Sequence, residues 1–232
     1  MSVTVLNSHP ILNKTSVSWL GIERLRSACL GMVILDIESL SPIEDQLLTR
    51  RELEKALRLG PGRRRSFFAA RIALKNLSRQ LNLIEGNRPD RTIETLGPDG
   101  LSPCLAESGL YCSASHSSRF VVAVAHWYPI GVDIEAVSEK ILKIQHLFIS
   151  SREEQLISKA GLDFKQSAMR VWTAKEAAAK ALRLHLLRAI RDVEVIKVEK
   201  ETSILRYKAM TYPVSHGEGG GQVIALITCE NF

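Results

Sequence analysis

The chain has 232 residues, of which 45% are hydrophobic and 24% are charged, a composition typical of globular domains. This balance excludes a disordered chain, which needs low hydrophobicity and high charge, and 14 glycines with 8 prolines exclude a collagen-like one. The best apolar run, residues 120–125, falls far short of the ~18 residues of a membrane helix. No secretory signal pattern opens the chain, so we expect a cytoplasmic protein without membrane contact.

The net charge of +6 is distributed unevenly along the chain. Residues 50–79 contain ten basic and two acidic residues, a local charge of +8, which leaves −2 for the remainder. A local basic field attracts phosphates, nucleic acid or an acidic protein face. A solvated helix face remains the alternative. The four cysteines show no metal-ligand spacing, and we expect reduced thiols.

The N-terminal half predicts one strand followed by helices. Residues 1–28 are weakly patterned and are interpreted as an N-terminal extension. Capping boxes, in which a glutamate follows an N-cap residue by three positions, predict helix starts at Ser41 and Thr49. Beyond a Gly-Pro-Gly break, a longer helix is expected over 63–83, and the strand is expected over 32–37.

The C-terminal half mixes strands with helices. A capping box at Ser151 and an Ala-, Leu- and Lys-rich stretch over 165–187 predict two helices, and 216–221 predicts a flexible turn. The expected strands are 110–115, 120–126, 130–135, 192–198, 203–210 and 222–228. Because strands and helices do not alternate strictly, an α+β fold is favoured over a doubly wound one, and two similar lobes are possible.

Two carboxylates share one face of the strand Gly131-Val132-Asp133-Ile134-Glu135. Alternate residues of a strand point the same way, so Asp133 and Glu135 project together while Val132 and Ile134 face the core. Adjacent carboxylates repel unless a cation lies between them, and Mg²⁺ prefers oxygen ligands that it shares with substrate phosphates. An edge strand with two exposed acids is the alternative.

The segment Trp172-Thr173-Ala174-Lys175-Glu176-Ala177-Ala178-Ala179-Lys180 adds a third carboxylate. On a helix, Trp172, Glu176 and Lys180 share one face, which could place Glu176 at a metal and Lys180 at a phosphate. The alternative is a surface Glu176–Lys180 pair with Trp172 in the core.

Two further features suit anions. The turn around Ser115-His116-Ser117 offers hydroxyls, amides and an imidazole for a phosphate, or is an ordinary polar hairpin turn. Arg63 and Arg71 lie two helical turns apart on roughly one face, where they could bind an anion or remain solvated.

Taken in this order, the motifs resemble those of the Sfp-type 4′-phosphopantetheinyl transferases. The shared motifs are Ala69-Ala70-Arg71, Ser115-His116-Ser117, Gly131 to Glu135 and Trp172 to Lys180, within residues 32–228. The resemblance implies two similar, pseudo-twofold-related α/β lobes, 29–128 and 129–232, with the active site in the cleft between them. It also implies transfer of the phosphopantetheine arm of coenzyme A to a serine of an apo acyl, peptidyl or aryl carrier protein, with release of adenosine 3′,5′-bisphosphate.

The resemblance also implies roles for individual residues. Asp133, Glu135 and Glu176 would hold Mg²⁺, or Mn²⁺, and Glu176 would accept the serine proton. Lys180 would bind the pyrophosphate. The nucleotide end of coenzyme A would be held by Arg63, Arg71, Ser115 and His116, and Lys175 would lie at the site. A monomer that binds no nucleic acid is expected.

Two departures from the family pattern stand out. Gly100-Leu101-Ser102-Pro103 lacks the basic residue that the family usually has before the Ser-His-Ser strand. Arg183 and His185 take the places of two family glycines, so the helix is expected to continue through 182–187. These departures motivate one rival, a coenzyme A- or nucleotide-binding protein without turnover. A nucleic-acid module built on 50–79 is a second rival, disfavoured by the absence of a recognisable motif and by 6% aromatic residues.

Overall fold

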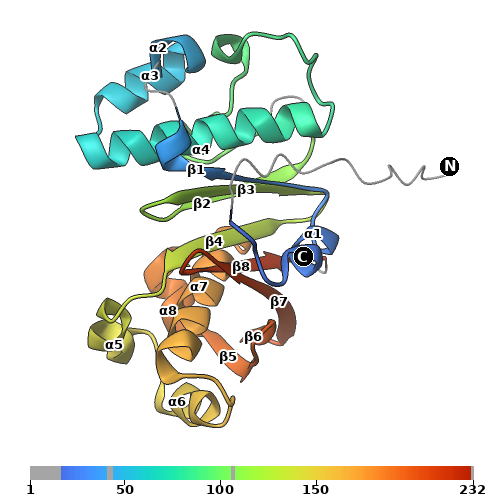
Figure 1. The fold of residues 1–232 in the computed structure, drawn as a ribbon. Helices are drawn as coiled ribbons and strands as arrows, with labels where there is room; N and C mark the ends of the chain where they lie inside the picture. The colour runs from blue at the N-terminus through green and yellow to red at the C-terminus, as the bar shows by residue number, and fades with distance from the viewer. Residues whose placement is uncertain (1–16, 41–43, 106–107, 231–232) are drawn as a thin grey trace, which may run out of the picture.

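The computed structural model describes residues 17–40, 44–105 and 108–230, and it divides into two lobes that each combine a sheet with helices (Figure 1). The N-terminal lobe has a three-stranded antiparallel sheet in the order β1-β3-β2. The C-terminal lobe has a five-stranded antiparallel sheet in the order β4-β8-β7-β6-β5. The fold is thus the mixed α/β architecture that the sequence predicts. The expected helix start at Ser41 lies outside the described residues.

The N-terminal lobe places one long helix across one face of its sheet (Figure 1). Apolar residues of this helix, among them Ala69, Leu74 and Leu77, are fully buried and pack on β1 and β3. The elements are α1 (Ile22–Ser27), β1 (Gly31–Asp36), η1 (Ile37–Ser39), α2 (Glu44–Leu47), α3 (Arg50–Leu57), α4 (Pro61–Gln80), η2 (Asp90–Thr92), β2 (Tyr111–His116) and β3 (Phe120–His126).

The C-terminal lobe also packs one long helix on its sheet, which has five strands rather than three. Its long helix is rich in alanine, and Ala174, Ala177 and Ala178 are fully buried against the sheet. The elements are β4 (Ile130–Ala136), α5 (Lys140–Ile144), η3 (Gln145–Leu147), α6 (Ser151–Ser158), α7 (Phe164–Ala181), α8 (Leu186–Asp192), β5 (Val193–Val198), β6 (Thr202–Tyr207), β7 (Met210–Gly219) and β8 (Gln222–Thr228).

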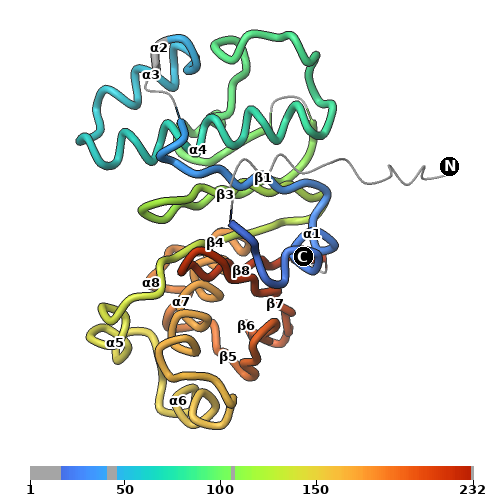
Figure 2. The backbone as a smooth tube through the Cα atoms, in the orientation of Figure 1, coloured from blue at the N-terminus to red at the C-terminus, as the bar shows by residue number. Residues whose placement is uncertain are grey.

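A third apolar core joins the two lobes. It contains Met32 and Val122 from the N-terminal sheet and Val132 and Leu226 from the C-terminal sheet. Residues 17–28 belong to this core: Trp19 makes an edge contact with Phe120 at 5.2 Å between ring centroids, and α1 packs against β7 (Figure 2). Residues 17–28 of the expected extension therefore pack into the fold, whereas residues 1–16 lie outside the described residues.

The C-terminal elements differ from expectation in three places. The capping box that opens α6 is formed by Ser150 with Glu153, one residue before the expected Ser151. α7 ends at Ala181, and a second helix begins at Leu186, where the His185 side chain accepts a hydrogen bond from the amide of Leu187. The continuous helix expected through 187 is therefore wrong. The turn expected over 216–221 is confined to 220–221, because β7 extends to Gly219 and its His216 is buried against Ser203.

No helix within the described residues is both long and apolar enough to span a membrane. All four cysteines are free thiols, and only Cys229 is fully buried.

Candidate active site between the lobes

The centre of the candidate site is built by one strand and one helix of the C-terminal lobe. Val132 and Ile134 of β4 are fully buried, which leaves Asp133 and Glu135 on the opposite face, as the alternation predicts. α7 lies on β4 at Gly131, where an added Cβ would fall 1.9 Å from the carbonyl oxygen of Ala177. Glycine at this position therefore permits the close approach that brings Glu176 and Lys180 to Asp133.

Asp133, Glu135 and Glu176 converge on one small volume. Each offers a carboxylate oxygen, and the three oxygens lie within 4.8 Å of one another. Asp133 is only 2% exposed, and its Oδ2 is buried without a hydrogen-bond partner in the described structure. An orphaned buried carboxylate oxygen is unfavourable unless a cation or a donor reaches it, so the donor set fits a hard divalent cation such as Mg²⁺.

Lys180 joins the carboxylates to the N-terminal lobe. Its Nζ lies 2.8 Å from Asp133 Oδ1 and donates to the Val132 carbonyl oxygen and to Ser115 Oγ, both at 2.9 Å. Ser115, at the end of β2, in turn donates to Asp133 Oδ1 at 2.7 Å. These contacts cross from β2 to β4 and α7, so the cluster lies at the junction of the two lobes.

The crowding of the three carboxyl groups favours either their protonation or the binding of a cation between them. Burial, and then the charge of Asp133, raise the pKa of Glu176 to about 8. The same two causes, in the same order, raise the pKa of Glu135 to about 7, partly offset by a hydrogen bond from Trp172. Carboxylates crowded together in a desolvated site resist ionisation. A bound cation would relieve this repulsion.

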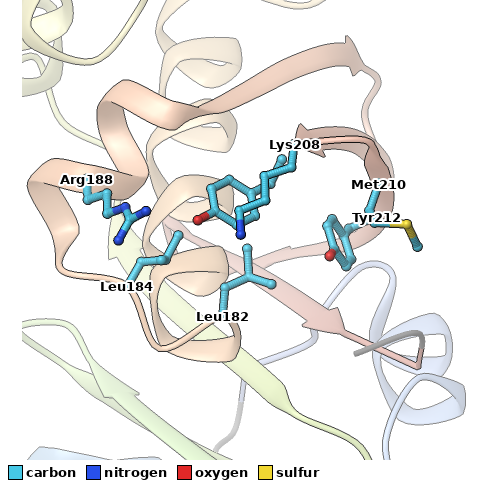
Figure 3. Close-up of a pocket in the computed structure, with 7 residues that line it drawn as sticks. Leu182, Leu184, Arg188, Lys208, Met210 and Tyr212 are labelled. Atoms are coloured by element: carbon cyan, nitrogen blue, oxygen red, sulfur yellow. The ribbon is translucent and has the colours of Figure 1, made fainter.

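A cavity of about 1060 Å³ opens next to Lys180. Both lobes line it: residues of the loop 97–105 and β2 on one side, and Ala179 to Ala181, Arg183 and Leu184 on the other. A smaller pocket of about 330 Å³ lies on the other side of Leu184, where Arg188, Lys208, Met210 and Tyr212 surround it (Figure 3). Lys180, which contacts Asp133, lines the larger cavity, and the size of this cavity suits a small organic ligand.

Comparison with known proteins connects this site to a family. Residues 129–227 match the model of the 4′-phosphopantetheinyl transferase superfamily, and this stretch contains Asp133, Glu135, Glu176 and Lys180. The part of the chain that carries the carboxylate cluster is thus similar to the 4′-phosphopantetheinyl transferase superfamily.

Three curated relatives show how far the similarity extends. The chain is 32% identical over 98 residues to 4′-phosphopantetheinyl transferase gsp of Aneurinibacillus migulanus, covering 42% of this chain and 41% of the relative. It is 29% identical over 98 residues to enterobactin synthase component D of Escherichia coli O157:H7, covering 41% and 48%. It is 32% identical over 139 residues to 4′-phosphopantetheinyl transferase HetI of a Nostoc species, covering 58% and 59%. The chain thus spans about half the length of the curated relatives it matches.

Not all residues that the superfamily resemblance assigned to the site lie there. Lys175 is 2% exposed, and its Nζ lies 2.8 Å from Glu153 Oε1 and donates to the carbonyl oxygens of Phe148 and Ile190. All three protons of the ammonium group are thereby used inside the C-terminal lobe. The expectation that Lys175 contributes to coenzyme A binding is corrected: it is a structural residue.

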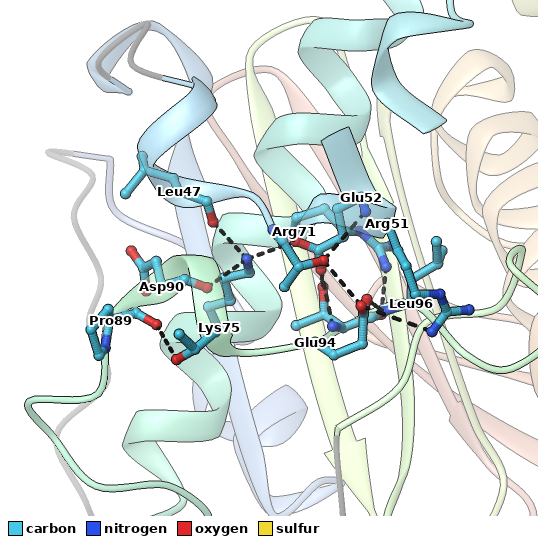
Figure 4. A network of polar contacts seen from close by, with 12 residues as sticks. Leu47, Arg51, Glu52, Arg71, Lys75, Pro89, Asp90, Glu94 and Leu96 are labelled. Atoms are coloured by element: carbon cyan, nitrogen blue, oxygen red, sulfur yellow. Dashed lines mark hydrogen bonds and ion pairs between the residues drawn. The ribbon is translucent and has the colours of Figure 1, made fainter. Parts of the chain in front are cut away.

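Arg71 is likewise enclosed. Its guanidinium donates to the Thr95 carbonyl oxygen at 2.5 Å and lies 5.0 Å from the centroid of the Phe67 ring, and the side chain is 5% exposed (Figure 4). Arg51 and Lys55 donate to the carbonyl oxygens of Gly97 and Gly100 in the same loop. These three cations therefore hold the loop that lines the cavity, a role that the charge pattern alone did not indicate.

The other two predicted residues take different positions. His116 lies at the end of β2, and partial burial of its ring, followed by the charge of Lys180, lowers its pKa. Arg63 is exposed in the first turn of α4, and no hydrogen bond or ion pair of its side chain occurs within the described residues. The charges of Lys180 and Asp133 act on the pKa of His116, whereas Arg63 makes no hydrogen bond or ion pair with the cluster among the described residues.

Two cavity-lining residues were missed by the motif analysis. Tyr111 of β2 and Arg183 lie on opposite lobes, and the guanidinium carbon of Arg183 is 5.7 Å from the centroid of the Tyr111 ring. Neither residue type forms a spacing pattern in the sequence. Only the packing of the two lobes brings them together.

Proposed function

We propose that the protein transfers the 4′-phosphopantetheine arm of coenzyme A to a serine of an apo acyl, peptidyl or aryl carrier protein. The observation that carries this proposal is the convergence of three carboxylates within 4.8 Å beside Lys180, at the mouth of a cavity lined by both lobes. Such a cluster suits a divalent metal ion that is coordinated by carboxylates of the protein and by phosphates of the substrate. The cavity can accept the nucleotide. The match of residues 129–227 to the superfamily model supports the same reaction.

Asp133, Glu135 and Glu176 would hold Mg²⁺, with Mn²⁺ as an alternative of similar ligand preference. Bound there, the ion would supply charge neutralisation for the pyrophosphate of coenzyme A. The buried Oδ2 of Asp133, which has no other partner in the described structure, is a ready ligand.

The chain's own groups orient the substrate and move one proton. Lys180 presents its ammonium group to the pyrophosphate and is itself fixed by Ser115, Val132 and Asp133. The serine oxygen of the carrier forms a bond to the pantetheine-bearing phosphorus, and the bond from that phosphorus to the bridging oxygen breaks. The departing group is adenosine 3′,5′-bisphosphate. Glu176, which is ionised when the cation is bound, accepts the serine proton.

We further propose a cytoplasmic monomer whose partners are coenzyme A and the carrier domain alone. The exposed arginines 58, 63 and 65 of the basic segment would attract both anionic partners. Residues 29–128 and 129–232 would act as the two lobes that enclose the nucleotide.

The decisive experiment incubates the protein with coenzyme A, Mg²⁺ and a panel of apo carrier domains, and weighs the carriers by intact-mass spectrometry. We expect one carrier type to gain the mass of one phosphopantetheine group, and EDTA to abolish the gain. A carrier whose serine is replaced by alanine is the matched control. No gain on any carrier would contradict the proposal, and if coenzyme A still bound, a binding protein without turnover would be favoured instead.

A further inference from the structure

Arg183 adopts a backbone conformation that favours glycine. Its φ is +52°, and only two other non-glycine residues of the described chain, Asn82 and Lys208, have positive φ. The conformation closes α7, because the amide of Leu184 then bonds to the Ala179 carbonyl oxygen at 2.8 Å, the pairing typical of a helix that ends in a left-handed residue. Arginine in this conformation costs free energy relative to glycine. The backbone therefore does not explain why this position carries arginine, which points to a role of its side chain.

The left-handed turn directs the Arg183 side chain along the interlobe cavity. Arg183 and Lys180 are the two basic residues that line this cavity, and Asp99 on the opposite wall is acidic. Within the described structure, Lys180 already donates to Ser115, Val132 and Asp133. Arg183 is exposed and makes no hydrogen bond or ion pair among the described residues, and its single close partner is the ring of Tyr111.

A guanidinium group stacked on an aromatic ring keeps its N–H donors available at its edge. Stacking uses the face of the group, whereas hydrogen bonds to a phosphate use the planar fork. Tyr111 therefore holds Arg183 from the opposite lobe without consuming its donors. Strained, conformationally restricted residues of this kind occur where a side chain serves a ligand.

We propose that Arg183 binds the ribose phosphate of coenzyme A, and that Tyr111 positions its guanidinium for this contact. Arg183 follows Lys180 by three residues, about one helical turn, and both line the cavity, so a ligand whose pyrophosphate lies at Lys180 can place a further phosphate at Arg183. The inference rests on the proposed function and adds to it a phosphate-binding residue contributed by the turn after α7.

The test is the variant Arg183→Gly, because glycine fits the left-handed conformation while removing the charge. We expect its melting temperature to equal or exceed that of the parent by ~2–4 °C. Its dissociation constant for coenzyme A, measured by calorimetry with Mg²⁺ present and no carrier, should rise about tenfold, as for loss of a charge-assisted hydrogen bond. For 3′-dephospho-coenzyme A the change should stay below about twofold.

Matched variants separate this role from general electrostatics. Arg188→Ala removes the same charge at the neighbouring pocket, where Arg188 pairs with Asp192 at 3.3 Å, and should leave the affinity for coenzyme A unchanged. Tyr111→Phe retains the ring and should also leave it unchanged, whereas Tyr111→Ala should weaken binding in the same direction as Arg183→Gly.

Four outcomes would overturn the inference. Unchanged affinity of Arg183→Gly for coenzyme A would show that the guanidinium makes no contact. An equal loss for both ligands, or an equal loss in Arg188→Ala, would show that no specific ribose-phosphate contact exists. If the parent protein bound no coenzyme A at all, the proposed function would fail, and the inference with it.

Discussion

The two lobes share one arrangement of helices, sheet and buried ion pair, which we call the frame. The three carboxylates of the candidate site come from only one of them, the C-terminal lobe. Each lobe has a short helix opened by a capping box whose glutamate is buried and pairs with a lysine of the long helix: Glu52 with Lys75 at 2.7 Å, and Glu153 with Lys175 at 2.8 Å. Each lysine also donates to two backbone carbonyl oxygens, and each glutamate accepts from a backbone amide, of Thr95 or Val195. Equivalent lysines and amides are separated by 100 residues in sequence.

The same 100-residue offset shows what the lobes do not share. Gly31 corresponds to Gly131, and both glycines lie against the long helix of their lobe. The N-terminal equivalents of Asp133, Glu135, Glu176 and Lys180 are Val33, Leu35, Asn76 and Gln80. Two apolar residues thus complete a core where the C-terminal lobe has carboxylates. The comparison shows that the buried ion pair is common to both lobes, whereas the carboxylate cluster is present, within the described residues, only in the C-terminal lobe.

The largest effect is expected from removing the added carboxylates. Glu176→Gln and Asp133→Ala should each lower the carrier-modification rate by ~10²–10⁴-fold, the range for loss of a general base or of a charge-stabilising group. The matched control is Asn76→Ala at the equivalent position of the N-terminal lobe, which should change the rate less than about twofold. Near-parent rates in either carboxylate variant, measured with folding verified by circular dichroism, would contradict the assignment of the site.

Breaking the shared frame should affect stability in both lobes alike. Lys75→Met and Lys175→Met each leave a buried glutamate without its cation, which should cost ~3–5 kcal/mol of unfolding free energy in urea titration. Replacing both partners, as in Glu153→Gln with Lys175→Met, should recover part of the loss. If Lys175→Met kept its stability yet lost coenzyme A binding, Lys175 would belong to the site and the comparison would fail.

The pH dependence of metal binding should sharpen the contrast. The pKa values of Glu135 and Glu176, about 7 and about 8, lie above the ordinary carboxyl value. The folded state therefore binds these protons more tightly than the unfolded state, and without metal this stabilisation is lost as pH rises through 7 to 8. A divalent cation binds the ionised form, so Mg²⁺ should raise the melting temperature more at pH 8.5 than at pH 6. An equal shift at both pH values, or none, would argue against a metal at this cluster.

The smallest effect compares the two helix ends. α4 and α7 both end with a left-handed residue, Asn82 at φ +53° and Arg183 at φ +52°. Asparagine tolerates this conformation better than arginine. Arg183→Gly should therefore stabilise the protein by about 1 kcal/mol, and Asn82→Gly by less. Thermal denaturation of both variants measures the difference, and a larger gain at Asn82 would contradict the strain assigned to Arg183.

The carboxylate site was predictable because its spacing is local. The alternation in β4 and the four-residue spacing in α7 place Asp133, Glu135, Glu176 and Lys180 on defined faces. Gly131 of β4 then allows α7 to approach the strand closely, which brings these two faces together. Secondary-structure periodicity was sufficient for these residues.

Residues whose partners are distant in sequence could not be assigned in this way. Arg71 and Lys175 belong to motifs that match the family, yet each finds its hydrogen-bond partners 15 to 27 residues away inside its own lobe. The end of α7 was missed because Arg183 adopts a conformation that its residue type disfavours. β7 was missed because Gly217 and Gly219 suggested a turn, whereas they permit α1 and Trp19 to pack closely on the strand.

The measurement that tests the central claim most directly compares nucleotide release with carrier modification in one reaction. Coenzyme A, Mg²⁺ and an apo carrier are incubated with the protein, and adenosine 3′,5′-bisphosphate and the modified carrier are both quantified. The account predicts equal amounts of the two products, and neither product when the carrier serine is replaced or Glu176 is changed to Gln. Nucleotide release without a carrier would indicate hydrolysis rather than transfer and would contradict the account.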